Sequence, residues 1–390
     1  MDTFTEIPSH SQLLLPLIDI LSAGPKKARD VVDELAERFG LPPEVASAFN
    51  DPQSRNRFRL FPRRVRWVKE TAKLHGLVQS IDHGVWALTD NGHDRLLNCR
   101  PGVVVVVYES DDGTVLWADA KSAAGVIAEE SVDLLITSPP YPLLNPREYG
   151  NLVGDVYVEW LLDNLKTAAT KLKDSGSLCL NLMPMQSAPG VPTESLYIER
   201  VLLRMVDDLK LHLCQRLIWW NPAKMVSGHW TTIKRVRLKS AFENVLWMSK
   251  TPHPKVNQRN VLLPYSDYMR RTIGRGGERR RARPSGHGTA KVGFARDNGG
   301  SIPSNIIRAA SATSNSRYHR FCRQHHLPVH PATFPKELPS FLIKLLTDPG
   351  DTVWDCFGGS CTVREVCEEL GRNFIINDKS LTYLAGSLGR

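Results

Sequence analysis

The sequence predicts an α/β protein in which a mostly parallel sheet is flanked by helices, with a small helical module before it and a basic insertion within it. Three observations lead to this prediction. From about residue 100, short apolar runs alternate with stretches of helical periodicity, which is typical of a parallel sheet. Residues 1–98 instead hold several helical stretches and one short ribbon. Residues 251–329 interrupt the alternation and are rich in Gly, Ser, Asn and Arg.

Composition limits the class of protein. The chain has 390 residues, of which 42% are hydrophobic and 23% charged, as in ordinary globular proteins. Apolar runs such as 103–107 are too short to span a bilayer, so we expect no membrane partner. The N-terminus is polar, and seven cysteines form no CxxC pair, which favours a reduced cytoplasmic protein. His325, His326 and His330 lack a matching Cys or acid pattern, so no metal is expected.

The positive charge is concentrated in the middle of the chain. The net charge is +9, but residues 210–330 hold 23 Lys and Arg against 4 Asp and Glu. The rest of the chain is mildly acidic. This distribution indicates a polyanionic partner, while a solvated basic face is the alternative.

The first module, residues 1–98, is expected to be helical with a short β-ribbon. Helices are expected over 11–21 and 25–41, and the pair Pro42-Pro43 opens another short helix. Residues 56–78 hold a basic stretch and then an apolar seam made of Val65, Val68 and Leu74. Residues 79–90 are expected to form a ribbon that turns at His83-Gly84. Helices followed by a ribbon form a winged-helix pattern, which resembles the N-terminal domain of the Mrr restriction family. Such a module binds DNA or serves as a dimerisation or protein-contact surface.

The α/β unit is expected to run from residue 99 to the end of the chain. Expected strands cover 103–108, 114–119, 132–137, 177–182, 217–220, 241–248, 352–354 and 373–376, and expected helices cover 156–173, 195–210, 338–346 and 364–370. Trp219-Trp220 is expected in the sheet core. The alternation of expected strands and helices, and the places where it begins and is interrupted, divide the chain into modules over 1–98, 99–250, 251–329 and 330–390.

A glycine turn follows one of the late strands. In DTVWDCFGGS, residues 351–360, a strand is expected to end at Asp355 and a helix to begin near Thr362. Gly358 and Gly359 allow the backbone to approach a ligand closely at this strand–helix turn. Asp378 follows at the end of the next strand, where an acid suits a ribose diol. The motif indicates a nucleoside site, although glycine turns at strand ends are common. No Gly-Lys-Ser/Thr supports an NTPase loop.

A proline corner follows an earlier strand. TSPPY, residues 137–141, comes directly after the apolar run VDLLIT. Two prolines fix the backbone and remove two N–H donors, so the corner presents carbonyl acceptors beside an aromatic ring. That combination suits a planar group with an exocyclic NH₂. A polyproline turn or ligand segment is the alternative, which the preceding buried strand disfavours.

From about residue 107 to the C-terminus, the chain resembles the β class of S-adenosylmethionine-dependent DNA amino-methyltransferases, and most of all its PvuII-type N4-cytosine branch. The resemblance extends over several stretches besides SPPY and FGGS. They are REYGNL (147–152), YVEWLL (157–162), GVPTESLY (190–197), WNPAK (220–224), RVRLKSAFENVLWMSKT (235–251), PYSDYM (264–269), RPSGH (283–287), DNGGSIPSN (297–305) and HPATFP (330–335). It implies a Rossmann-like methyltransferase fold with an inserted target-recognition region over 251–329.

The resemblance implies that S-adenosylmethionine is the cofactor and that the enzyme methylates N4 of a cytosine flipped out of double-stranded DNA. The implied catalytic residues are Ser138, Pro139, Pro140 and Tyr141. The Ser138 hydroxyl and the Pro139 carbonyl would accept hydrogen bonds from the target amino group, and Tyr141 would stack on the base. The implied cofactor-binding residues are Asp119, Phe334, Pro335, Asp355, Phe357, Gly358, Gly359, Ser360 and Asp378. Cys361 departs from the class, which has a third glycine there.

Within the basic insertion, Arg and Asn side chains are candidates for phosphate contacts and base recognition. They are Arg270, Arg271, Arg275, Arg279, Arg280, Arg281, Arg283, Asn298 and Asn305. Double-stranded DNA is therefore the expected partner. A restriction endonuclease acting on the same site and a second copy of the chain are partners that the sequence leaves open.

Two other functions compete with N4-cytosine methylation. N6-adenine methylation also proceeds through an exocyclic amine. A catalytically silent DNA-binding regulator would use the winged helix alone, but the intact SPPY and FGGS segments argue against it.

Overall fold

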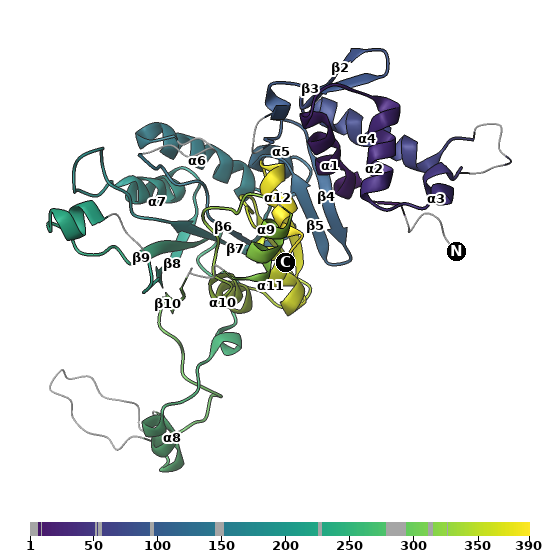
Figure 1. Cartoon of the computed structure of the whole chain (residues 1–390). Helices are drawn as coiled ribbons and strands as arrows, with labels where there is room; N and C mark the ends of the chain where they lie inside the picture. Colours follow the sequence, from purple (N-terminus) through teal and green to yellow (C-terminus); the bar gives the residue numbers. More distant parts are fainter. Residues whose placement is uncertain are drawn as a thin grey trace.

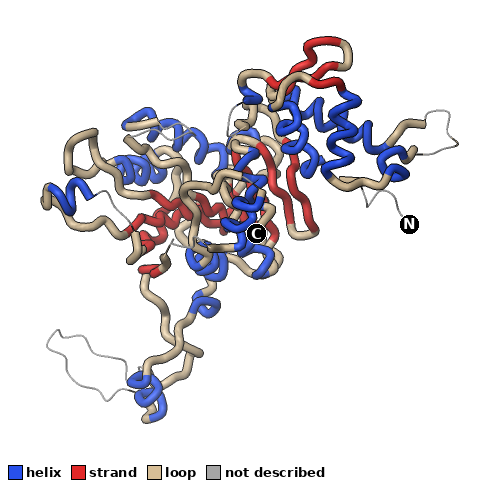
Figure 2. The backbone as a smooth tube through the Cα atoms, in the orientation of Figure 1, coloured by secondary structure: helices blue, strands red, loops and turns tan. Residues whose placement is uncertain are grey.

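A nine-stranded sheet forms the centre of the protein (Figures 1 and 2). The computed structural model describes residues 7–8, 10–50, 53, 57–93, 97–144, 152–224, 228–277, 294–310, 315–325 and 327–390. The strands of these residues lie in the order β10 (Ile306–Arg308), β8 (His212–Trp220), β9 (Phe242–Ser249), β7 (Leu172–Leu182), β6 (Val132–Thr137), β11 (Thr352–Asp355), β12 (Asn373–Asp378), β5 (Gly113–Trp117) and β4 (Val105–Ser110). From β7 to β5 every neighbouring pair is parallel, whereas β9 is antiparallel to both of its neighbours and β4 to β5. The predicted α/β class with a mostly parallel sheet is confirmed.

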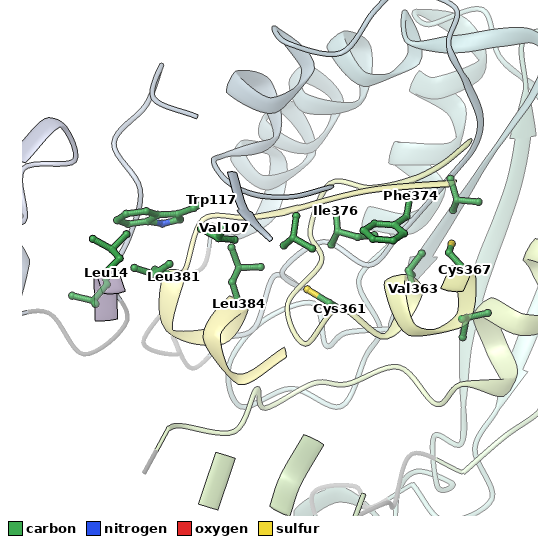
Figure 3. Packing of buried hydrophobic residues seen from close by; sticks show 14 of the residues in the cluster. Leu14, Val107, Trp117, Cys361, Val363, Cys367, Phe374, Ile376, Leu381 and Leu384 are labelled. Carbon is green, nitrogen blue, oxygen red and sulfur yellow. The ribbon is translucent and has the colours of Figure 1, made fainter. Parts of the chain in front are cut away.

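Helices cover both faces of the sheet. One face carries α5 (Ala120–Ala124), α6 (Gly154–Ala169) and α7 (Tyr197–Asp207), and the other carries α10 (Glu337–Leu346), α11 (Thr362–Leu370) and α12 (Leu381–Ser387). Because side chains alternate along a strand, Leu135 of β6 packs with the first group and Leu134 and Ile136 pack with the second. Figure 3 shows the second cluster, in which Phe374 and Ile376 of β12 meet the residues of α11 and α12.

The N-terminal module contains four helices in its described residues, α1 (His10–Ser22), α2 (Ala28–Arg38), α3 (Pro43–Ser47) and α4 (Leu60–Leu74). A small antiparallel sheet joins β1 (Lys26–Lys27), β3 (Val85–Leu88) and β2 (Val78–Asp82), and a short 3₁₀ turn follows at Asn91–His93. The β2–β3 hairpin turns at His83-Gly84, as expected. Val65 and Val68 are buried, but Leu74 is 61% exposed, so it lies outside the apolar seam in which the sequence placed it.

The module packs against the β4–β5 edge of the large sheet, where α1 contacts β4 (Figure 1). The His75 ring stacks on Trp117 of β5, with ring centroids 3.7 Å apart. Leu14 of α1 belongs to the same buried cluster as Trp117 (Figure 3). The two parts of the chain therefore share one apolar core.

Several boundaries differ from those that the sequence predicts. The helix expected to reach residue 173 ends at Ala169, because Leu172 already pairs with Val132 and belongs to β7. Trp219 is buried, but Trp220 is 40% exposed, because the two side chains point to opposite sides of β8. Helix α12 had no counterpart among the expected elements.

Residues 251–329 are not one separate unit. The 3₁₀ turn at Gln258–Val261 packs against α10, whereas α8 (Asp267–Gly274) lies on an arm that extends away from the sheet (Figure 1). The chain then returns, since β10 pairs with β8 and α9 (Arg317–Gln324) packs on α12. A single turn of π-helix at His229–Ile233 precedes β9. Among the described residues, none of the helices has the length and apolar character needed to cross a membrane.

Candidate active site

The proline corner and the glycine loop lie at the same edge of the sheet. Strands β6 and β11 are parallel neighbours, so their carboxyl ends emerge side by side. Ser138 directly follows β6, and Asp355 is the last residue of β11. The Thr137 hydroxyl donates a 2.7 Å hydrogen bond to the Asp355 carboxylate, although the two residues are 218 positions apart in the chain. The fold thus brings together two motifs that the sequence keeps far apart.

The glycine loop is packed tightly against the end of β12. The Gly358 N–H donates to the Asn377 carbonyl at 2.8 Å, and the Gly359 N–H donates to the Asp378 carboxylate at 2.9 Å. A Cβ atom on Gly358 would lie 2.3 Å from Cγ2 of Ile376, closer than any real contact. Only glycine allows this close approach of the loop to β12.

Both motifs line one cavity of about 470 Å³, a size typical of small-molecule sites. Its wall includes nearly all of the residues predicted for catalysis and cofactor binding: Ser138, Pro139, Pro140, Tyr141, Asp119, Phe334, Asp355, Phe357, Gly358, Gly359, Ser360 and Asp378. Pro335, which follows Phe334, is not part of the wall.

A larger cavity, of about 930 Å³, lies between the N-terminal module and the α9–α12 layer, where Leu15, Val107 and Leu384 form part of its wall. It contains neither motif, so we assign the chemistry to the smaller cavity.

The three acids predicted to bind the cofactor, Asp119, Asp355 and Asp378, already have partners in the protein. Asp119 is the N-cap of α5, with one oxygen accepting the Ser122 N–H at 2.9 Å and the other 2.7 Å from the Ser122 hydroxyl. Asp378 accepts the N–H groups of Gly359 and Ser380. These bonds fix the carboxylates at the rim of the cavity, where their remaining lone pairs can accept from a ligand.

The pKa of Asp355 is strongly shifted. Burial raises the pKa of Asp355 to about 7, and the nearby Asp378 charge acts in the same direction. Hydrogen bonds from the Thr137 hydroxyl and the Phe357 N–H oppose this shift of the pKa. A carboxyl group that titrates near neutrality in a cavity is typical of a functional site.

A buried polar cluster behind Tyr141 was not predicted from the sequence. The Tyr141 hydroxyl donates to Oε2 of Glu243 at 2.7 Å and lies 2.8 Å from the Ser138 hydroxyl. The Asn181 amide donates to Tyr141 and to Glu243, each at 2.7 Å, and Lys224 forms a 2.9 Å ion pair with Glu243. Burial, followed by the Glu243 charge, raises the pKa of Tyr141 well above its usual value, so the phenol stays protonated. The available signal was a polar residue inside each of two apolar strands, LCLNL and FENVLW.

Other residues of the cavity wall also had no predicted role. They are Cys99, Pro101, Ala120, Lys121, Trp160, Asp163, Asn164, His330, Ala332, Cys356, Thr362, Lys379, Ser380 and Tyr383. Trp160 of α6 packs against Phe357, with ring centroids 5.7 Å apart. The His330 ring lies edge-on to the Tyr383 ring. A Cβ atom on Gly359 would lie only 2.9 Å from Nε2 of His330. Among the residues that the structure describes, no group of three or more His, Cys, Asp or Glu could hold a metal ion.

Those residues predicted to contact DNA that the structure describes lie apart from this cavity. Arg270 and Arg271 belong to α8 on the arm, and Arg275 is its C-cap. Asn298 is exposed, and its N–H donates to the Tyr265 hydroxyl. Asn305 instead uses its amide to hold the Arg216 carbonyl at the sheet edge. Arg279, Arg280, Arg281 and Arg283 lie outside the described residues.

Comparisons with known proteins agree with this geometry. A DNA methylase family model matches residues 132–387, and a model of the Mrr N-terminal domain matches residues 10–98. The Type II methyltransferase M.PvuII of Proteus hauseri is 38% identical over 286 residues, which cover 73% of this chain and 84% of that protein. The DNA adenine methyltransferase YhdJ of Escherichia coli is 23% identical over 75% of this chain and 86% of its own length.

One solved structure extends the comparison to three dimensions. The cytosine-N4-specific PvuII DNA methyltransferase superposes with a TM-score of 0.59 at 32% identity, covering 73% of this chain and 88% of that one. The family model alone spans more than half of the sequence and includes both motifs of the cavity. The chain therefore belongs to the DNA methylase family.

Proposed function

We propose that this protein transfers a methyl group from S-adenosylmethionine to N4 of a cytosine in double-stranded DNA. The observation that carries the proposal is the cavity shared by the SPPY corner and the glycine loop, with Tyr141 and Gly358 in one wall. A cytosine-N4-specific relative at 38% identity supports this choice of base over adenine. The relative is a Type II methyltransferase, which supports a restriction endonuclease of the same site as partner.

The cavity wall fits S-adenosylmethionine in its chemistry. When bound, this cofactor supplies a methyl group that is already activated by a positively charged sulfur. Asp378 would accept from the ribose hydroxyls and Asp119 from the adenine amino group. Asp355 and the glycine loop would hold the methionine part, whose ammonium group an ionised carboxylate attracts. Phe334 and Phe357 supply apolar wall.

The SPPY corner would position the target base. The Ser138 hydroxyl and the Pro139 carbonyl accept hydrogen bonds from the amino group, which directs its lone pair out of the ring plane. Tyr141 stacks on the flipped base, and flipping costs a few kcal/mol. Holding nitrogen, methyl carbon and sulfur in line is worth about 7–11 kcal/mol of the barrier in well-oriented systems. Water then takes up the amine proton.

Exposed arginines on the arm would contact phosphates. Arg270, Arg271 and Arg275 lie on or next to α8, on the arm that extends away from the sheet (Figure 1). Each neutralised phosphate adds about 0.9 to the salt dependence of binding. Base recognition by Asn298 stays a prediction, and Asn305 has its amide engaged within the protein.

The N-terminal module offers a second basic surface, formed by Arg59, Arg63, Arg66 and Trp67 of the α4 region. Arg63 stacks on Phe58 and faces Trp67, which is 57% exposed. On α2, by contrast, Arg29 and Arg38 pair with acids. Within the described part of the chain, no such ion pair involves Arg63 or Arg66. Because α4 directly precedes the β2–β3 hairpin, it has the place of a recognition helix, so we expect this surface to bind DNA.

Mass spectrometry of nucleosides tests the proposal. Unmethylated plasmid DNA is incubated with the protein and S-adenosylmethionine, and N4-methylcytosine is the expected product. N6-methyladenine alone would overturn the choice of base, and no methylated base would favour a silent regulator. Ser138→Ala and Tyr141→Ala are expected to abolish transfer while the cofactor still binds. An active double variant would refute the assigned site.

A further inference from the structure

The cluster behind Tyr141 contains a charge for which the reaction proposed above has no evident use. The Glu243 side chain is only 8% exposed, and Lys224 beside it is 14% exposed. One carboxylate oxygen of Glu243 accepts from Lys224, and the other accepts from Tyr141 and Asn181. A buried ion pair costs desolvation free energy, so its presence next to a catalytic corner calls for an explanation.

The hydrogen atoms of this cluster can be assigned from chemistry alone. Glu243 forms an ion pair with the Lys224 ammonium group, and a carboxylate in an ion pair only accepts hydrogen bonds. The single hydroxyl hydrogen of Tyr141 therefore points to Glu243. The Asn181 amide must turn its NH₂ toward the same oxygen, because the flipped amide would face oxygen with oxygen.

The position of the Tyr141 hydrogen also determines the direction of the hydrogen bond between Tyr141 and Ser138. Its hydroxyl oxygen lies 2.8 Å from Tyr141 Oη, and one of the two atoms must donate. Since Tyr141 gives its hydrogen to Glu243, Ser138 gives its own hydrogen to Tyr141. What remains on Ser138 for a molecule in the cavity is lone pairs, so Ser138 can accept but not donate.

We propose that Glu243 is a positioning residue, which acts through Tyr141 to fix Ser138 as a hydrogen-bond acceptor facing the cavity. The inference rests on the proposed function, because an acceptor at this place matches an exocyclic amino group and repels a carbonyl oxygen. It explains how the corner would distinguish cytosine from thymine, whose rings differ at this position by NH₂ against C=O.

Glu243→Gln allows the direction of these hydrogen bonds to reverse at almost constant side-chain volume. The glutamine amide can donate to Tyr141, whose hydroxyl can then donate to Ser138, which frees the Ser138 hydrogen to point into the cavity. We expect the single-turnover rate of methyl transfer from tritiated S-adenosylmethionine to plasmid DNA to fall by about tenfold or more, the effect of one misdirected hydrogen bond. The dissociation constant of S-adenosylmethionine, measured by calorimetry, should stay within about twofold.

A double-mutant cycle separates positioning from plain structural support. Tyr141→Phe keeps the ring but cuts the link, so Glu243→Gln should have little further effect on the rate in the Tyr141→Phe background. Asp133→Asn is the matched control, since Asp133 is a buried acid paired with Lys173 at the opposite end of β6. It should leave the rate unchanged.

The outcomes of these experiments decide whether Glu243 acts through Tyr141. Equal losses of rate from Glu243→Gln in the two backgrounds overturn the inference, and so does an unchanged rate in the single variant. If Glu243→Gln does not fold, Lys224→Met takes its place, because it removes the ion-pair partner of Glu243. Lys224→Met must then lower the rate of methyl transfer in the wild-type background but not in the Tyr141→Phe background. If the wild type transfers no methyl group, the proposed function itself is wrong and the inference falls with it.

Discussion

Thr137 and Asp355 connect the two halves of the active site. Their 2.7 Å hydrogen bond joins the residue before the SPPY corner to the residue before the glycine loop, and Asp355 is only 2% exposed. Burial holds the pKa of Asp355 near 7, so its charge changes within the range in which enzymes are assayed. If Asp355 contacts the cofactor as proposed, the affinity for the cofactor should depend on pH.

We expect the affinity for S-adenosylmethionine to rise between pH 6 and pH 8. Asp355 becomes ionised over this range, and only the carboxylate attracts the ammonium group of the methionine part. The rise should be up to about tenfold, and calorimetry at several pH values measures it. Asp355→Asn should lower the affinity and remove the rise. Thr137→Val removes a donor to the carboxylate, so it should shift the midpoint to higher pH. A pH-independent affinity in the wild type would exclude Asp355 from cofactor binding.

The same shift predicts how stability depends on pH. The pKa of Asp355 in the folded protein, about 7, lies above its ordinary value of 3.8, so the folded state holds the proton more tightly than the unfolded state. The contribution of Asp355 to the free energy of unfolding should therefore fall as pH rises from about 4 to 7, by up to about 1.4 kcal/mol per pH unit. Urea denaturation of the wild type and Asp355→Asn should differ by this slope. Parallel pH curves for the two proteins would contradict it.

Gly359→Ala should weaken S-adenosylmethionine binding by about tenfold or more. Gly359 has φ +49°, and its Cβ would lie 2.9 Å from Nε2 of His330, so the loop must move. Gly371→Ala is the matched control, because Gly371 has φ +67° but its Cβ would meet no atom within 4 Å. It should lose about 1 kcal/mol of stability and keep its affinity. Gly359→Ala/His330→Ala removes the clash and should regain part of the binding.

The sequence predicted most of the motifs of the site, because each motif follows a strand whose apolar run is visible. Ser138 directly follows β6, Gly358 lies in the turn after β11, and Asp378 is the last residue of β12, and parallel strands bring these ends together. Glu243 is visible in the sequence only as a polar residue in an apolar strand, and its partners could not be predicted, since they depend on β9 lying beside β7 in antiparallel register. Cys361 adopts a left-handed conformation, φ +54°, which explains why glycine suits this position and which no local pattern reveals. The pairing of β10 with β8 could not be predicted either, because a strand of three residues has no recognisable sequence pattern.

Acidification should weaken the contact between the N-terminal module and the large sheet. Burial lowers the pKa of His75, which stacks on Trp117, to about 4. The unfolded state binds this proton more tightly than the folded state, so the contribution of His75 to the free energy of unfolding falls as pH drops from about 6.5 to 4, opposite in sign to the contribution of Asp355. His75→Phe keeps a ring on Trp117 and should lose this dependence. Urea denaturation at pH 7 and pH 5 measures the difference, and an equal loss in both proteins would exclude His75 as its source.

Neutralising two arginines of α4 should weaken DNA binding in a salt-dependent way. If Arg63 and Arg66 each contact a phosphate, Arg63→Gln/Arg66→Gln should reduce the slope of log affinity against log salt by about 1.8. Arg29→Gln/Arg38→Gln changes the net charge equally, but both of these arginines already pair with acids, so the slope should stay near that of the wild type. Fluorescence anisotropy with a labelled duplex at several salt concentrations gives both slopes. Equal slopes for the two double variants would mean that net charge, and not this surface, governs binding, and would leave protein contact as the role of the module.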